Sequence, residues 1–173
     1  GFDVYQILEA CQEHIVQFGG HRYAAGLTIK PEDYLAFKKA FESAVAQNIK
    51  PEQRVPSTAY DLEMTLDKIT PKFYRIIAQM SPFGPGNMRP VFLSKNCLDG
   101  GATRAVGKDQ SHLKLDVTDT SKVTLSGIGF GMAKHINKIK SRDLFQVLFT
   151  LDENEFGGVK SLQLKLKDLR FSN

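Results

Sequence analysis

The spacing of hydrophobic residues changes along the chain, from a helical period near the start to strand-like alternation later. Apolar residues from Val4 to Phe18 recur every three or four positions, which predicts a helix that ends at Gly19-Gly20. Residues 23–29 are small and apolar and precede a proline, which predicts a buried strand. Pro31 opens a second predicted helix, with an apolar stripe made of Tyr34, Phe37, Phe41, Ala44 and Val45.

The two predicted helices and the strand between them indicate part of an α/β domain in residues 1–50. This stretch is too short to bury a sound core, so we expect the beginning of the domain to lie upstream of it. Residues 51–57 form a polar, proline-containing linker. Alternating apolar residues then predict a half-buried strand, and they are Tyr60, Leu62, Met64 and Leu66.

Thr70-Pro71 has the residue types of a helix N-cap followed by the first helical position, and it precedes an apolar stripe of Phe73, Ile76, Ile77 and Met80. Residues 82–90 contain three prolines and two glycines, which excludes regular structure. The next strand is expected at residues 91–98 and continues at 102–106 beyond a bend at Gly100-Gly101. Four more strands are expected at 112–118, 123–128, 144–151 and 162–169, and a short helix at 132–139. The pattern predicts an α+β chain that ends in a small five-stranded barrel, residues 58–173.

Three details of the chain follow from the same pattern. Phe145 and Phe149 share a strand face with other apolar residues, so we expect both in the core. The acidic run at residues 152–155 is expected to be a solvated hairpin turn before Gly157-Gly158. Cys11 and Cys97 lie far apart without companion ligands, which indicates buried thiols rather than a disulfide or a zinc site.

Charge separates the two parts of the chain. Residues 1–57 carry 6 Lys+Arg and 7 Asp+Glu, whereas residues 58–173 carry 17 and 12, a net charge of +5. A nucleic acid is therefore one expected partner of the second part, although many basic domains bind nothing anionic. The chain shows neither an apolar run of membrane-spanning length nor a signal-peptide pattern at residues 1–4, so we expect a cytoplasmic protein that is not inserted in a membrane.

Two sets of residues are candidates for chemistry. Gly19 and Gly20 let backbone N–H groups approach a phosphate, and His21 beside them can donate a hydrogen bond; the alternative is a simple helix cap. Basic residues on or beside the second and third strands and on the following helix are candidates for nucleic-acid binding, and they are Lys108, His112, Lys114, Lys122, Lys134 and Lys138. Since residues 112–128 contain no Phe, Tyr or Trp, we expect a mainly electrostatic contact.

A complete active site is not expected in this chain. The four histidines are scattered, and no two of them fall at metal-ligand spacing together with a carboxylate. Neither a Gly-x-Ser-x-Gly elbow nor a phosphate-binding P-loop is present. We therefore predict that the chain alone has no catalytic metal and does not cleave nucleic acid.

Residues 19–27, Gly-Gly-His-Arg-Tyr-Ala-Ala-Gly-Leu, followed by Pro-Phe-Gly-Pro-Gly-Asn at residues 82–87, resemble two motifs of the RecJ family of single-strand-specific 5′→3′ DNA exonucleases. The resemblance implies that residues 1–50 are the C-terminal part of a DHH-associated domain and that the barrel is an OB-fold. It also implies that Gly19, Gly20 and His21 contact a substrate phosphate, and that Arg89 points toward DNA at the start of the barrel.

The same resemblance implies a parent enzyme of DNA repair and recombination that uses Mn²⁺ or Mg²⁺ held by a DHH domain upstream of this chain. Expected partners are single-stranded DNA, that DHH domain and the single-strand-binding protein. Two alternatives stay open. One is another DHH-superfamily phosphoesterase that acts on short RNAs or cyclic dinucleotides, and the other is a non-catalytic module that binds a protein or single-stranded DNA.

Overall fold

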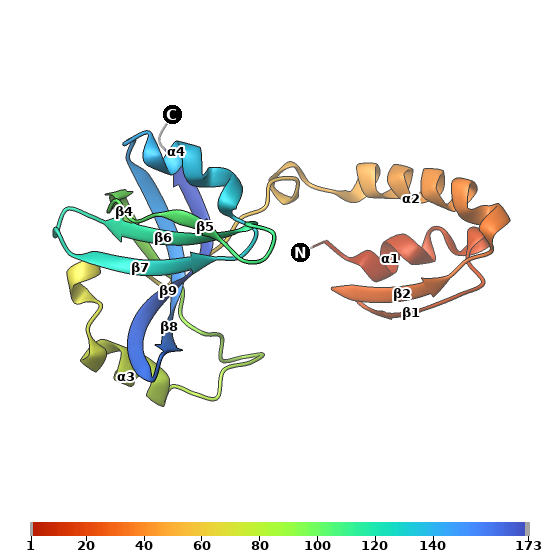
Figure 1. Cartoon of the computed structure of the whole chain (residues 1–173). Helices are drawn as coiled ribbons and strands as arrows, with labels where there is room; N and C mark the ends of the chain where they lie inside the picture. Colours follow the sequence, from red (N-terminus) through yellow and green to blue (C-terminus); the bar gives the residue numbers. More distant parts are fainter. Residues whose placement is uncertain (1, 172–173) are drawn as a thin grey trace. The chain divides into compact units, whose positions relative to one another are not determined.

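The structure is a computed structural model that describes residues 2–171, and the chain divides into two compact units, Gly1–Thr58 and Ala59–Asn173. The first unit contains two helices and a two-stranded antiparallel sheet (Figure 1). Its elements are α1 (Val4–Glu9), the 3₁₀ turn η1 (Gln12–His14), β1 (Gln17–His21), β2 (Ala24–Thr28), η2 (Pro31–Asp33) and α2 (Tyr34–Asn48), and η3 (Pro51–Gln53) follows them.

The first helix is much shorter than the apolar spacing predicts. It ends at Glu9, and the chain then enters strand β1, which pairs with β2 from Gln17 opposite Thr28 to His21 opposite Ala24. The N–H of Val16 extends this pairing by donating to the carbonyl of Thr28 at 2.9 Å. Because the partner strand lies so close in sequence, the backbone N–H and C=O groups of residues 17–21 form hydrogen bonds between strands instead of within a helix. The glycine pair therefore lies within a strand and does not end a helix.

Other predictions for the first unit hold in part. Strand β2 and helix α2 lie where the pattern places them, but most of β2 is exposed rather than buried. Tyr34 at the start of α2 is 53% exposed, so it does not belong to a buried stripe, while Phe37 and Phe41 are half-buried. The buried apolar side chains in the described part of this unit are Ile7, Leu8 and Cys11.

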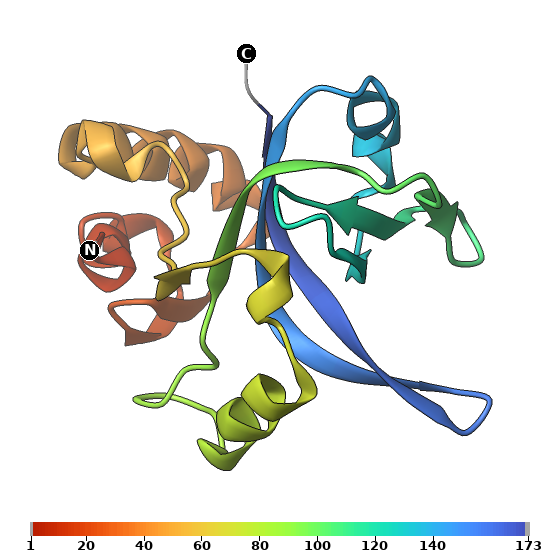
Figure 2. The same ribbon diagram turned by 90° about the vertical axis from the view of Figure 1, so that its left-hand side faces the viewer.

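The second unit is a seven-stranded sheet with helices at its margins (Figures 1 and 2). Its elements are β3 (Leu62–Glu63), η4 (Leu66–Lys68), α3 (Pro71–Gln79), β4 (Phe92–Asp99), β5 (Arg104–Val106), β6 (His112–Thr118), β7 (Thr124–Gly129), η5 (Ala133–His135), α4 (Ile136–Lys140), β8 (Phe145–Phe156) and β9 (Val159–Phe171). Strand β4 pairs with both β8 and β6, so the pairings β4–β8–β9–β7–β6–β4 return to the strand where they begin. Only the β3–β4 and β7–β9 pairs of this sheet, among the described residues, are parallel.

The core lies inside this ring of pairings. Phe145 and Phe149 are fully buried there, which confirms their predicted role, and every second residue of β6 joins them, at Leu113, Leu115 and Val117. Gly127 of β7 also faces inward, because a Cβ added to it would lie 2.6 Å from a methyl group of Leu166. The strand β7 can therefore approach β9 closely only with glycine at this position.

Three predicted features are confirmed. Strand β4 ends just before Gly100-Gly101 and continues as β5, which also pairs with β6, so the bend lies where expected. Thr70 caps α3, since its hydroxyl accepts a hydrogen bond from the N–H of Phe73 at 3.1 Å. Cys11 and Cys97 are both buried free thiols, as predicted.

Three predictions for the second unit are wrong. The strand expected from Tyr60 to Leu66 shrinks to the two residues of β3, because only this stretch meets the edge of β4. The apolar stripe predicted for α3 also includes residues that the helix does not bury. Ile76 and Met80 are 51% and 47% exposed, since the helix packs on the core through Phe73 and Ile77.

The third correction concerns the acidic run. Residues 152–155 are not a turn, because each is paired with a residue of β9 and β8 continues to Phe156. The turn itself consists of Gly157 and Gly158, which have φ values of 60° and 79° and suit a tight hairpin. Figures 1 and 2 show β8 and β9 as two long, curved strands that run side by side.

Residues 82–90 form a closed loop before β4. The side-chain amide of Asn87 donates to the carbonyls of Met80 and Pro82 at 2.8 and 2.9 Å. Gly84 and Asn87 also exchange two backbone hydrogen bonds of 2.9 Å. Internal bonds of this kind fix the loop without regular secondary structure.

Candidate functional site

His21 lies at the end of β1 with its side chain exposed. Its Nδ1 atom accepts hydrogen bonds from the N–H groups of Tyr23 and Ala24 at 3.2 and 3.3 Å. A neutral imidazole that accepts at Nδ1 carries its proton on Nε2. The hairpin turn thus orients the ring and leaves one N–H donor available to an external acceptor.

The two glycines before His21 serve different needs. Gly20 has φ of +146°, and a Cβ added there would lie 2.4 Å from the carbonyl oxygen of Ala24, so the hairpin itself requires glycine. A Cβ added at Gly19 would meet no heavy atom within 4 Å among the described residues. The fold therefore gives a steric reason for one glycine, and the bare backbone at Gly19 faces open space.

The clearest arrangement in the second unit is a row of side chains across four strands. Arg104 of β5 lies opposite Lys114 of β6, and Lys114 lies opposite Ile128 of β7. Ile128 in turn lies opposite Lys165 of β9 through the parallel β7–β9 pairing. Residues directly opposite one another share a face of the sheet, and the alternate residues of β6 fill the core, so this row lies on the outer face.

We call Arg104, Lys114, Ile128 and Lys165 the outer row. Sequence analysis identified only Lys114 among them. Arg104 and Lys165 lie on strands far apart in the chain, and no sequence spacing reveals that strand register aligns them. The signal that was available is alternation: Lys165 lies between the buried residues Leu164 and Leu166 on the last strand.

The outer row is strongly basic. Burial lowers the pKa of Lys114 from its usual value, and the nearby Arg104 cation lowers it further. None of the ion pairs found within residues 2–171 includes Arg104, Lys114 or Lys165. Lys114 and Arg104 are neighbouring cations that repel one another, and Lys165 adds a third positive charge to the row; an anion bound across the strands would relieve the repulsion between the first two.

The predicted residue His112 lies beside the outer row at the start of β6. Its Nδ1 atom accepts from the N–H of Gly131 at 3.2 Å, and its ring centroid lies 5.1 Å from that of Phe130, edge to face. Phe130 is 59% exposed. Sequence analysis missed this aromatic residue because the predicted strand ended two residues earlier.

The other predicted basic residues are dispersed. Exposed Lys108 lies in the turn before β6, and Lys134 lies in η5, whose Ala133 N–H bonds to the carbonyl of Ser111 next to His112. Lys122 lies in the turn at the opposite end of β6, and the Nζ atom of Lys138 lies 4.8 Å from the ring centroid of Phe171. Register therefore joins only Lys114 to the outer row.

Arg89 is occupied by contacts within the unit. Its Nη1 atom donates to the carbonyl of Leu151 at 2.9 Å, and its guanidinium lies 4.9 Å from the ring centroid of Phe83. It lines a cavity of about 420 Å³ together with Met88, Thr150, Lys165 and others. These contacts connect the loop at residues 82–90 to strand β8.

Within the described residues, no three His, Cys, Asp or Glu side chains gather in a way that could hold a metal ion. The donor set for Mg²⁺ or Mn²⁺ is thus not provided by residues 2–171. Likewise, none of the helices in this range has the length and apolar character needed to cross a membrane.

Comparison with known proteins gives a uniform result. The family model described as the RecJ OB domain matches residues 60–168. The chain is 27% identical over 99% of its length to the single-stranded-DNA-specific exonuclease RecJ of Bacillus subtilis, and 30% identical over 87% of its length to the same enzyme of Haemophilus influenzae. It spans only 22% and 26% of those two relatives.

Solved structures agree with the sequence matches. A crystal structure of RecJ in complex with Mn²⁺ from Thermus thermophilus superposes with a TM-score of 0.74 at 22% identity, covering 99% of this chain and 24% of that one. The Mg²⁺ complex from the same organism gives a TM-score of 0.69 at 20% identity, covering 99% of this chain and 26% of that one. The family-model match covers more than half of the chain, and the chain therefore belongs to the RecJ family.

Proposed function

We propose that this chain is the C-terminal part of an exonuclease that degrades single-stranded DNA from the 5′ end, in the cytoplasm, during DNA repair and recombination. The observation that carries the proposal is the outer row, which presents Arg104, Lys114 and Lys165 on one face of the sheet. Its role is to bind the phosphates of the strand and guide it. Binding through charge alone tolerates any base sequence, as an exonuclease requires.

The second unit is proposed to be a five-stranded OB barrel. Three observations support this: the pairings that return to β4, the helix between the third and fourth strands of that ring, and the parallel pairing of β7 with β9. In such barrels the second and third strands form the usual face for single-stranded nucleic acids. Those strands correspond to β6 and β7, which contribute Lys114 and Ile128.

The first unit is proposed to be part of a DHH-associated domain that holds a substrate phosphate. Here Gly19 supplies an unobstructed backbone and His21 an oriented Nε2–H donor. The Mg²⁺ or Mn²⁺ ions would be bound by an upstream DHH domain, so we predict that residues 1–173 alone do not cleave DNA. The single-strand-binding protein is a further proposed partner.

The charge-based role can be tested with the chain alone. We expect weak binding to a fluorescein-labelled oligo(dT), with log K falling against log salt at a slope of roughly −2 if about three phosphates are neutralised. Replacing Arg104, Lys114 and Lys165 together by Ala should bring that slope close to zero. The matched control replaces Lys72, Arg75 and Lys140, and it should leave the slope unchanged. Equal slopes for both triple variants would refute the role of the outer row.

The role of His21 requires the complete enzyme. His21→Ala should lower the turnover number by about 10²-fold, the order expected for loss of one preorganised donor. Because the side chain is exposed, the melting temperature should change by no more than a few degrees. Full activity of the variant would mean that His21 only caps its hairpin.

A further inference from the structure

Phe130 is an exposed aromatic residue between two glycines that have contacts within the unit. It follows Gly129, at which an added Cβ would lie 2.7 Å from the Sδ atom of Met132, so the strand before it is closely packed. It precedes Gly131, which has φ of +69° and donates its N–H to the Nδ1 atom of His112. Both neighbours of Phe130 thus have contacts within the unit, and the ring between them projects into solvent.

His112 supports the ring as well as the backbone. Its imidazole stands nearly perpendicular to the Phe130 ring, with an interplanar angle of 72° and a centroid distance of 5.1 Å. An edge-to-face pair uses the edge of one ring and leaves other parts of the second ring uncovered. This agrees with the 59% exposure of Phe130, which leaves an aromatic surface open to a flat ligand.

The position of Phe130 relative to the outer row matters. Ile128 is a member of the row and lies two residues before Phe130, so about 7 Å of extended chain separates the two. An apolar aromatic surface therefore lies at the side of a row of cations. A single nucleic-acid strand is complementary to this surface, because its bases are flat and apolar and its backbone is anionic.

We propose that Phe130 is a base-stacking site for single-stranded nucleic acid and that His112 is its positioning residue. This inference rests on the proposed function of the outer row and adds to it an uncharged contact. One base stacks on Phe130 while neighbouring phosphates lie on Lys114 and Arg104. The contact is independent of base identity, because every base has a π-face.

The chain contains no tryptophan, which permits a direct test. Phe130→Trp introduces a single indole whose fluorescence should be quenched when oligo(dT) binds, because the base stacks on it. The matched control is Ile76→Trp on α3, a side chain that is 51% exposed and not part of the outer row. Its fluorescence should not change on binding.

Affinity measurements complete the test. Phe130→Ala should weaken oligo(dT) binding by about 5- to 160-fold, the range for one stacked base, and leave the salt slope unchanged. Phe130→Tyr should retain most of the affinity, and His112→Ala should fall between wild type and Phe130→Ala. Circular dichroism should show that all three variants keep the fold.

The failures are distinguishable. If the wild-type chain binds with the expected salt slope but Phe130→Ala binds equally well and the indole is not quenched, the stacking site is overturned and the outer row stands. If Phe130→Ala changes the salt slope, the residue acts through the charges and the stacking proposal is wrong. If the wild-type chain does not bind oligo(dT) at all, the proposed function of the outer row fails and the stacking site fails with it.

Discussion

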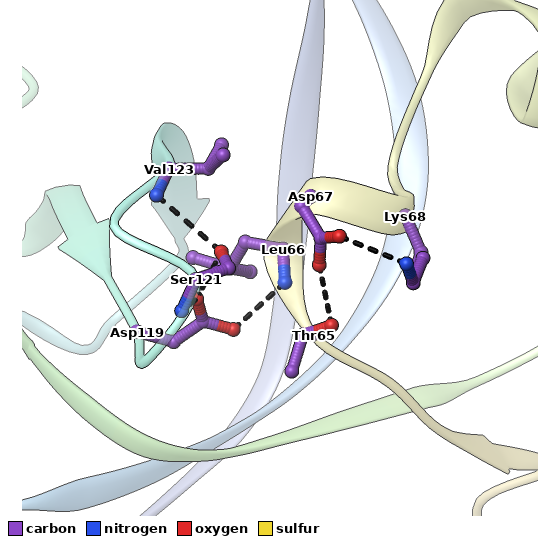
Figure 3. A network of polar contacts seen from close by, with 7 residues as sticks. All are labelled: Thr65, Leu66, Asp67, Lys68, Asp119, Ser121 and Val123. Atoms are coloured by element: carbon purple, nitrogen blue, oxygen red, sulfur yellow. Dashed lines mark hydrogen bonds and ion pairs between the residues drawn. The ribbon is translucent and has the colours of Figure 1, made fainter.

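The carboxylate of Asp119 accepts a hydrogen bond of 2.7 Å from the backbone N–H of Leu66, across 53 positions of sequence (Figure 3). Asp119 is only 7% exposed, and its other oxygen accepts from the N–H of Ser121 at 2.9 Å. The hydroxyl of Ser94 lies 3.3 Å from the oxygen that Leu66 uses. One buried carboxylate therefore connects the β6–β7 turn to the segment before α3, and so helps to fix the strands that carry the outer row.

Removal of this carboxylate should destabilise the second unit. In Asp119→Ala the buried N–H of Leu66 and the part-buried N–H of Ser121 would lose their acceptor, which we expect to cost about 2–3 kcal/mol. Asp119→Asn should cost less, because it keeps one acceptor oxygen. The measurement is urea unfolding followed by circular dichroism. The control is Asp143→Ala, at an exposed position, which should change the stability only slightly. A wild-type midpoint for Asp119→Ala would contradict the structural role.

The two glycines of the hairpin should respond differently to alanine. Gly20→Ala forces a Cβ into the carbonyl of Ala24, so it should lower the stability of the first unit by more than about 1 kcal/mol. Gly19→Ala meets open space and should leave the fold unchanged. If the proposed phosphate contact forms in the complete enzyme, however, Gly19→Ala should reduce activity, since a Cβ there would obstruct the approach of the phosphate. Thermal melts and activity assays of both variants would show whether stability and activity separate in this way.

The buried thiol of Cys97 should make the second unit sensitive to alkali. Burial raises its pKa from an ordinary value of 9.0 to about 11. Between those values the unfolded thiol loses its proton and the folded one keeps it, so stability should fall as pH rises through this range, by about 2–3 kcal/mol. Cys97→Ala lacks this contribution, and its stability should fall less steeply across the same range. Parallel slopes for the two proteins would exclude the effect.

The same property predicts slow thiol chemistry. Burial also raises the pKa of Cys11, and both thiols are shielded from solvent. The folded chain should therefore react slowly with a disulfide reagent at about pH 8, and denaturant should release both cysteines for fast reaction. Rapid reaction of either cysteine in the native protein would show that its unit opens readily.

The sequence predicts a strand, cap or bend well where the residues of that segment alone determine it. Strand β6 alternates buried and half-buried residues, and its predicted and observed limits coincide at His112 and Thr118. The cap at Thr70 and the bend at Gly100-Gly101 also follow from local chemistry. By contrast, the helical spacing of apolar residues up to Phe18 does not produce a helix of that length, because residues 17–21 pair with β2 instead. The periodicity of one segment carries no information about such a pairing.

The candidate site shows the same division. His21 and Lys114 were identified from motif and position. Arg104 and Lys165 join Lys114 only through strand register, and Phe130 joins His112 only through a turn beyond the predicted strand end. Long-range register and turn geometry are properties of the fold, so a window of sequence cannot supply them.

For Arg89, a structural role and a DNA-binding role lead to opposite predictions for the Arg89→Lys variant. The guanidinium bonds to the carbonyl of Leu151 and packs on the ring of Phe83. If these contacts are its function, Arg89→Ala and Arg89→Lys should both lose stability, by about 1–3 kcal/mol, since an ammonium does not reproduce the planar stack. Oligo(dT) affinity and salt slope should stay as in the wild type.

If Arg89 instead contacts DNA, Arg89→Lys should retain the salt slope, and Arg89→Ala should make it less steep by roughly 0.7, one phosphate's share for a single strand. Stability would then hardly change in either variant. Urea unfolding and salt-dependent binding of the same two proteins therefore decide between the roles. From the two contacts that Arg89 makes, we expect the first pattern: stability lost and binding retained.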